Sequence, residues 1–159
     1  MTLNKQPNSS HCFACGLENT YGLKLTFFSE GDGKAVCEYQ VPEQFQGYPG
    51  VVHGGVVASM LDEAVVRAFM AGDPNRFMYT AKLTLRYRHP VPTGKSLKIV
   101  GIVTKDRGRI AESKAELFGP DGTLLAEAEA LVVDLPEELD GVTDLDGLDW
   151  KVYPDEEAV

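Results

Sequence analysis

The sequence predicts one α+β domain in which a curved antiparallel sheet of about six strands wraps around one long central helix. Strand-like segments bounded by turn residues follow one another along most of the chain. A single stretch, from Val56 to about Gly72, has its apolar residues at helical spacing. No second helical stretch is present to cover the other face of the sheet, and 159 residues fit a single domain.

The first elements are expected to form a hairpin. Leu23–Phe28 is predicted to be a strand, Gly31–Gly33 its turn, and Lys34–Val41 the partner strand. The side chains that share one face of the partner strand are Ala35, Cys37, Tyr39 and Val41. Between Pro42 and Gly55 glycine and proline are frequent, which predicts a loop that can shape a binding site.

The helix is expected to end near Gly72-Asp73-Pro74, giving a length of about 25 Å. Four strands follow it, and their short turns predict that they are antiparallel neighbours. These strands are Phe77–His89, Ser96–Lys105, Arg109–Phe118 and Leu124–Val133. Small side chains line one face of each of the last two strands: Ala111, Ser113 and Ala115, and Ala126, Ala128 and Ala130. A long helix is expected to pack closely against them.

Composition divides the chain into a lead segment (1–22), a folded domain (23–134) and an acidic tail (135–159). The net charge of −9 arises in the tail, which holds nine acids against Lys151, whereas residues 1–134 hold 15 acids and 14 bases. Without a cluster of basic residues, nucleic-acid binding is not expected. The acidity favours a solvated tail, and its apolar side chains leave docking on the body or on a partner as the alternative. Those side chains are Leu139, Val142, Leu145, Leu148, Trp150, Val152 and Tyr153.

Neither a secretory signal nor a membrane-spanning stretch is recognisable in residues 1–19, so a cytoplasmic protein without a membrane partner is expected. Cys12, Cys15 and Cys37 are an odd number of cysteines in a chain large enough to bury a core, which predicts reduced thiols. The Cys-x-x-Cys pair looks like half of a zinc site, but no second pair follows it. We therefore expect no metal.

The predicted helix carries two adjacent carboxylates in different surroundings. Glu63 lies four residues before Arg67, the favourable order for an ion pair on an exposed strip, so we interpret it as structural. Asp62 has no such partner and shares its side of the helix with apolar residues. Burial raises the pKa of a carboxylate and makes an unpaired one costly. Periodicity alone leaves two equal alternatives: a structural aspartate, bonded across an interface or capping another element, and a catalytic one.

The turn before the helix is a candidate oxyanion site. Because Gly54 and Gly55 lack side chains, a ligand oxygen can reach the free amides at the helix N-terminus. His53 can donate to the same oxygen or act as a base, whereas a tight loop with a satisfied histidine is the alternative. Gly55 and Asp62 lie about 10 Å apart along a helix, too far for one reacting centre. If both are catalytic they come from different subunits, which predicts a dimer.

The stretch Phe45–Gly55, continued through Met60–Ala64 and Tyr87–Pro92, resembles hotdog-fold acyl-CoA thioesterases. These enzymes are of the phenylacetyl-CoA thioesterase type. Within their superfamily, the chain most resembles the mitochondrial acyl-CoA thioesterase branch. The pattern of this superfamily is His-Gly-Gly with an aspartate nine residues after the histidine, matched here by His53 and Asp62. The resemblance implies hydrolysis of acyl-CoA to a free acid and CoA, without a cofactor. It also implies a homodimer, or a homotetramer of two dimers.

The resemblance implies roles for four residues. Asp62 attacks the thioester or activates water, while the Gly55 N–H of the other subunit polarises the carbonyl and His53 assists. Thr80 matches a threonine that lies near the attacking water in such enzymes. Strand alternation places Thr80 on a polar face that also holds Lys82, Thr84 and Arg86.

Four further residues are expected to bind substrate. Gly54 belongs to the oxyanion turn, and Gln46 lies beside Gly47, where bacterial phenylacetyl-CoA enzymes carry Asn, so an aryl substrate is not implied. Arg107 and Arg109 share one hairpin, where they can meet the CoA phosphates, with a solvated turn as the alternative.

Two other functions remain open. An enoyl-CoA hydratase or dehydratase of the same fold is one, and a non-catalytic acyl-CoA-binding protein is the other. The spacing of His53 and Asp62 favours hydrolysis over the lyase, and the absence of a DNA-binding module weakens the sensor. Similar proteins often begin with a Cys-x-x-Cys-Gly segment such as Cys12–Gly16, which we interpret as a packing segment or a flap over the substrate pocket.

Overall fold

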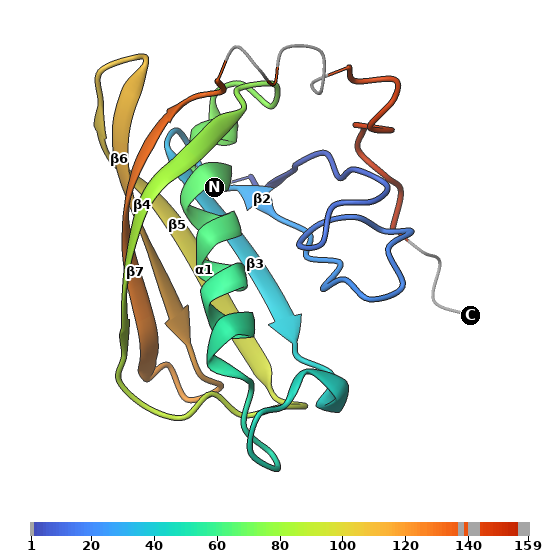
Figure 1. Ribbon diagram of the computed structural model, residues 1–159, viewed down its shortest axis with the longest axis vertical. Coiled ribbons are helices and arrows are strands. Elements are labelled where there is room, and N and C mark those ends of the chain that lie inside the picture. Colours follow the sequence, from blue (N-terminus) through green and yellow to red (C-terminus); the bar gives the residue numbers. More distant parts are fainter. Residues whose placement is uncertain (1, 137–138, 140–143, 156–159) are drawn as a thin grey trace.

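The computed structural model describes residues 2–136, 139 and 144–155 and has the predicted α+β architecture. One antiparallel sheet curves around helix α1 (Gly54–Arg67), which lies along its concave side (Figure 1). The strands follow the order β1-β2-β3-β5-β6-β7-β4 across the sheet. They are β1 (Asn4–Lys5), β2 (Phe28–Ser29), β3 (Lys34–Gln40), β4 (Met78–Tyr87), β5 (Ser96–Asp106), β6 (Ile110–Phe118) and β7 (Leu124–Asp134). The predicted fold class is therefore confirmed, with β1 as an additional short strand.

The predicted first strand is mostly wrong, because only Phe28–Ser29 pair with β3. The alternating apolar side chains before them are buried as expected, but their backbone has other partners. The amides of Leu23 and Leu25 donate to carbonyls of the lead segment at 2.8 and 2.9 Å. Alternation predicts which side chains are buried, whereas it does not specify which backbone the segment pairs with.

The strand order corrects a second expectation. Strand β4 is not a neighbour of β5 but pairs antiparallel with β7 at one edge of the sheet. The eight connecting residues, 88–95, cross the end of the sheet, where the amides of Arg88 and His89 donate to the Leu125 carbonyl at 2.8 and 3.0 Å. Eight extended residues reach about 26 Å, and three strand spacings need only about 14 Å, so a short connection does not force pairing.

The helix lies directly on the sheet, as its small side chains predicted. Gly101 of β5 has no room for a side chain, because a Cβ there would lie 2.0 Å from the carbonyl oxygen of Ala64. The helix ends at Arg67, before the expected Gly72, and a 3-10 helix (η2, Phe69–Ala71) continues the chain. Among the described residues, no helix has both the length and the apolar character needed to cross a bilayer.

The lead segment and the tail lie together at one side of the domain (Figure 1). Residues 144–155 dock on the body, which corrects the favoured expectation of a solvated tail. The Trp150 indole N–H donates to the Pro74 carbonyl at 3.2 Å, and its ring centroid lies 5.2 Å from that of Phe77. Val142 lies outside the described residues. The half-buried aromatic contact between Phe77 and Trp150 favours docking, because aromatic pairs contribute beyond the area that they bury.

Candidate active site

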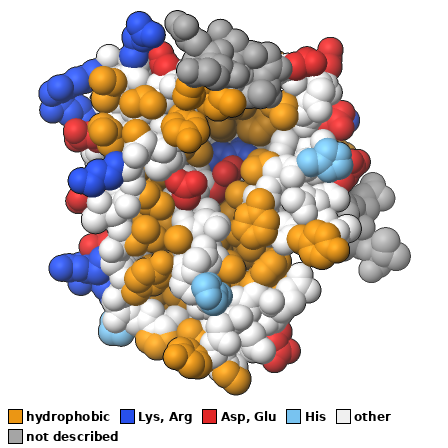
Figure 2. Space-filling view, in the orientation of Figure 1, with side chains coloured by type: hydrophobic (Ala, Val, Ile, Leu, Met, Phe, Trp, Pro, Cys, Tyr) orange, Lys and Arg blue, Asp and Glu red, His pale blue; other side chains and the backbone are white. Residues whose placement is uncertain are grey.

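Asp62 borders a small pocket between α1 and β4, which we call the carboxylate pocket. Its volume is about 390 Å³, and Ala58, Ser59 and Asp62 of the helix and Thr80–Leu83 of the strand line it. On the face along which α1 runs, acidic side chains lie among hydrophobic ones (Figure 2). The pocket thus presents a carboxylate among both apolar and polar side chains.

The Asp62 carboxylate is only partly satisfied. Its Oδ1 atom is buried and has no hydrogen-bond partner among the described residues. Burial raises the pKa of Asp62 above its ordinary value, the Thr80 side chain opposes this shift as a hydrogen-bond partner, and the Glu63 charge adds to it. A buried carboxylate oxygen without a donor costs free energy. In the described part of one chain, the Asp62 Oδ1 atom therefore has no contact that offsets its burial.

Thr80 faces the helix, which corrects the polar face predicted for it. A β-bulge between Thr80 and Lys82 leaves Ala81 without a partner on β7. Before the bulge Thr80 pairs with the fully buried Val132, and after it Lys82 pairs with Leu131, which is 36% exposed. Because directly paired side chains share one face of an antiparallel sheet, the bulge places Thr80 on the inner face and Lys82 on the outer one.

The oxyanion turn, His53–Gly55, forms the N-terminus of α1. His53 is the N-cap, and its Nδ1 accepts a hydrogen bond from the Gly55 amide at 3.0 Å. The Gly54 amide, at the first helical position, has no intrahelical partner. The Tyr87 hydroxyl, which sequence reasoning did not single out as a site residue, donates to the Gly54 carbonyl at 2.7 Å. An exposed tyrosine at a strand end carries no periodic signal that would reveal this contact.

The other predicted substrate-binding residues lie apart from the carboxylate pocket. The Gln46 Oε1 accepts a hydrogen bond from the Gly50 amide at 3.3 Å, so this side chain holds the loop that precedes the oxyanion turn. Arg107 and Arg109 belong to the β5–β6 turn, at the opposite end of the sheet from the oxyanion turn (Figure 1). The 90% exposed Arg109 side chain lies 3.6 Å from Asp134. A single chain does not bring either arginine to the pocket.

The Glu63–Arg67 ion pair is confirmed at 2.7 Å, but the predicted exposed strip is wrong. Arg67 is only 1% exposed. Its guanidinium lies 5.7 and 5.1 Å from the ring centroids of Phe27 and Trp150, and Nη1 donates to the Pro7 carbonyl at 2.7 Å. The lead segment and the tail cover this side of the helix, which helical periodicity alone does not predict.

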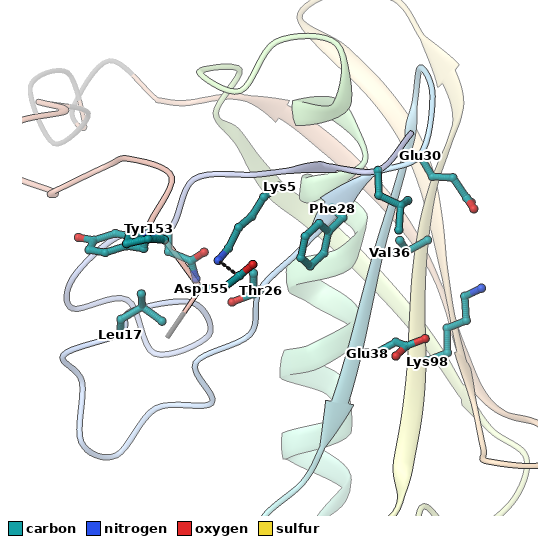
Figure 3. Close-up of a pocket in the computed structure, with 13 residues that line it drawn as sticks. Lys5, Leu17, Thr26, Phe28, Glu30, Val36, Glu38, Lys98, Tyr153 and Asp155 are labelled. Carbon is teal, nitrogen blue, oxygen red and sulfur yellow. Dashed lines mark hydrogen bonds and ion pairs between the residues drawn. The ribbon is translucent and has the colours of Figure 1, made fainter. Parts of the chain in front are cut away.

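A larger cavity, of about 600 Å³, lies between the lead segment, the outer side of β2 and β3, and the docked tail (Figure 3). Phe28, Val36 and Tyr153 contribute apolar surface, and Lys5 pairs with Asp155 at 2.6 Å. Neither Asp62 nor the oxyanion turn lines this cavity. We therefore place the candidate active site at the carboxylate pocket and the oxyanion turn.

Comparison with known proteins identifies the family to which this part of the chain is similar. Residues 49–126 match the family model of the thioesterase superfamily, and this segment contains the oxyanion turn, Asp62 and Thr80. Acyl-coenzyme A thioesterase THEM4 of Xenopus laevis is 30% identical over 112 residues, covering 69% of this chain and 49% of that protein. Acyl-coenzyme A thioesterase 13 of Homo sapiens is 26% identical over 105 residues, covering 65% and 75%. The chain spans about half the length of the THEM4 relatives.

A solved structure agrees with the family match. The crystal structure of a thioesterase superfamily protein superposes with a TM-score of 0.70 at 28% sequence identity, covering 78% of this chain and 60% of that chain. A sheet curved around one long helix is common to both, which is the hotdog fold predicted from the resemblance. The chain therefore belongs to the thioesterase superfamily and has its hotdog fold.

Proposed function

We propose that this protein hydrolyses acyl-CoA thioesters to a free acid and CoA. The observation that carries the proposal is the buried, unpartnered Oδ1 of Asp62 beside a pocket that Thr80 also lines. A carboxylate with a raised pKa is a stronger base than an ordinary one, which suits it to take a proton from water. The names of the acyl-coenzyme A thioesterases to which the chain is similar support the substrate class.

In the proposed reaction Asp62 attacks the thioester carbonyl carbon or removes a proton from a water molecule that attacks it. The carbonyl oxygen becomes an oxyanion, the carbon–sulfur bond breaks, and CoA leaves as a thiolate. Where Asp62 is the nucleophile, water then hydrolyses the resulting anhydride, which releases the acid and restores the carboxylate. The amides at the start of α1, aided by the helix dipole, are suited to stabilise that oxyanion. Because the Gly55 amide donates to His53, a substrate oxygen uses the Gly54 amide or displaces the imidazole. Water is the only co-reactant, so we propose that no cofactor takes part.

The proposed site needs two subunits, because Gly55 and Asp62 lie seven residues apart on one helix, about 10 Å. A two-fold axis with the helices antiparallel would bring the oxyanion turn of one copy to Asp62 of the other. The midpoint between the two positions falls at Ala58 and Ser59, whose small side chains line the carboxylate pocket and permit close approach. Strand β4 ends the sheet, so pairing of two copies along it would also protect an open edge.

The activity is tested by incubating the protein with a panel of acyl-CoA esters and following release of free thiol. We expect release by the wild type and by the control Asp32→Asn, whose side chain is exposed in the β2–β3 turn. Asp62→Asn should lower kcat at least about a hundredfold. Undiminished release by Asp62→Asn would overturn the proposal. Hydration of enoyl-CoA without thiol release would identify a hydratase, and tight binding without turnover a non-catalytic acyl-CoA-binding protein.

The shared site has a separate test. Asp62→Asn and His53→Ala, each of low activity, are unfolded and refolded together in equal amounts. In a two-fold dimer half of the molecules are mixed, and each mixed dimer has one intact site, so about a quarter of the wild-type activity should return. If no activity returns, the two groups do not act across subunits, and hydrolysis itself is not contradicted.

A further inference from the structure

Cys12 and Cys15 lie in one tight turn of the lead segment, outside the proposed active site. The Gly16 amide donates to the Cys12 carbonyl at 2.8 Å, and a Cβ at Gly16 would lie only 2.4 Å from that oxygen. A turn closed by such a bond brings residues three apart to a Cα separation of about 5 Å, within the range that a disulfide needs. Cys12 is exposed, Cys15 is only 3% exposed, and both thiols are free.

The buried member of the pair is held in place by the backbone around it. The Asn8 side-chain amide donates to the carbonyls of Cys15 and Leu25, at 2.8 Å each. The Ser9 hydroxyl lies 3.5 Å from the Cys15 sulfur and also accepts a hydrogen bond from the Cys12 amide at 3.4 Å. These contacts fix the turn that holds the two thiols near one another.

The surroundings of the pair favour a thiolate. A hydrogen bond from Cys15 lowers the pKa of Cys12 to about 6, and the same bond together with burial raises the pKa of Cys15. The buried guanidinium of Arg67 lies near Cys15, and its Nη2 has no hydrogen-bond partner among the described residues. The Arg67 charge lowers the pKa of Cys15, whereas burial and the Glu63 charge oppose the downward shift of the Cys12 pKa. An exposed thiolate beside a proton donor is the environment of reactive cysteines. Cys37 differs, because its burial in the core raises its pKa to about 12.

The pair lacks the neighbours of a metal centre. A structural zinc site needs four ligands, and the described residues contain no group of three or more His, Cys, Asp or Glu side chains placed to hold a metal ion. The chemistry that remains for two adjacent thiols, one activated and one buried beside it, is exchange between dithiol and disulfide.

We propose that Cys12 and Cys15 form a redox-active dithiol that peroxides oxidise to an intramolecular disulfide and that low-molecular-weight thiols reduce again. The Cys12 thiolate attacks the peroxide, so that a sulfur–oxygen bond forms, the oxygen–oxygen bond breaks and an alcohol or water leaves. The Cys15 sulfur then attacks the Cys12 sulfur. The sulfur–sulfur bond forms, the sulfur–oxygen bond breaks, and the hydroxyl group leaves with the Cys15 proton as water. Two electrons pass from the pair to one peroxide, and two thiols return them as a low-molecular-weight disulfide.

The test treats the full chain with hydrogen peroxide and follows the intact mass and the free thiols. We expect the wild type to lose two hydrogens and to keep a single free thiol. Addition of glutathione should restore the original mass and the two lost thiols. Cys12→Ser and Cys15→Ser should not lose hydrogens, whereas the control Cys37→Ala retains the pair and should lose them. Oxygen added at Cys12 without loss of hydrogens, or equal slow reaction of all three cysteines, would overturn the proposal.

A second measurement does not depend on disulfide formation. Alkylation of Cys12 by iodoacetamide at neutral pH should be at least about tenfold slower in Cys15→Ala, because the thiolate loses its hydrogen-bond donor. An unchanged alkylation rate would show that Cys15 does not activate Cys12, and would contradict the proposal even if the variant folds normally.

Discussion

Nδ1 of His53 accepts a hydrogen bond from the Gly55 amide at 3.0 Å, so the histidine caps the N-terminus of α1. The Gly55 amide is the group that His53 was expected to assist in polarising the substrate carbonyl. A ring nitrogen that accepts carries no proton, which places the proton of the neutral ring on Nε2. The Nε2–H is thereby available to donate to a substrate oxygen. His53 thus combines a structural bond through one nitrogen with a donor on the other.

His53 substitutions separate these two roles. His53→Ala removes the cap and should lower the free energy of unfolding by about 1 kcal/mol, while His53→Asn, a good N-cap residue, should recover most of that loss. Both variants lack the Nε2–H, so kcat should fall in both. Urea denaturation and thiol-release kinetics measure the two effects. An alanine variant as stable as the wild type would show that the observed bond contributes nothing to the helix.

Asp62→Asn is expected to raise Tm at pH 7 although it lowers activity. Burial raises the pKa of Asp62 in the folded state above its unfolded value. Between these two pKa values the unfolded chain loses a proton that the folded chain keeps, so stability falls as pH rises and stays lower above the window. Asparagine avoids this cost at pH 7, and below the window the two proteins should have similar Tm. Calorimetry across pH tests this, and a variant less stable than wild type at pH 7 would contradict it.

Thr80→Val removes the hydroxyl that lowers the pKa of Asp62 while preserving the shape of the side chain. The acid limb of the kcat/KM profile should therefore move to higher pH, with kcat reduced about tenfold. Thr84→Val is the matched control, because Thr84 lies on the same strand, after the bulge, and is exposed. If both variants change the profile equally, the inward orientation of Thr80 is not what matters.

Gly101→Ala should destabilise the protein by about 3 kcal/mol, because the added Cβ would meet the Ala64 carbonyl at 2.0 Å and lift the helix from the sheet. Gly72→Ala is the control. Its φ is −94° and no atom lies within 4 Å of a Cβ there, so its effect should be small. Urea unfolding of the two variants compares them directly. Equal stabilities would mean that the helix moves away from the sheet without lowering the free energy of unfolding.

Local patterns predicted most of the elements that surround the site. The last four strands begin and end within about two residues of their predicted limits, because each combines alternating side chains with a clear turn. The face predicted for Thr80 was wrong because the unpaired Ala81 reverses the alternation, and an alanine in a strand gives no sign of a bulge. The adjacency of β4 and β5 was wrong because connection length limits strand order only weakly.

The sequence by itself determined the fold class, the position of the helix, and the difference between Asp62 and Glu63, since backbone geometry sets the period of apolar residues locally. Only the tertiary structure decided that Thr80 turns inward, that His53 engages Gly55, and that the docked tail helps to bury Arg67. These outcomes depend on contacts between segments that are distant in the chain or on backbone irregularities. Neither long-range contacts nor backbone irregularities produce a periodic pattern in the sequence.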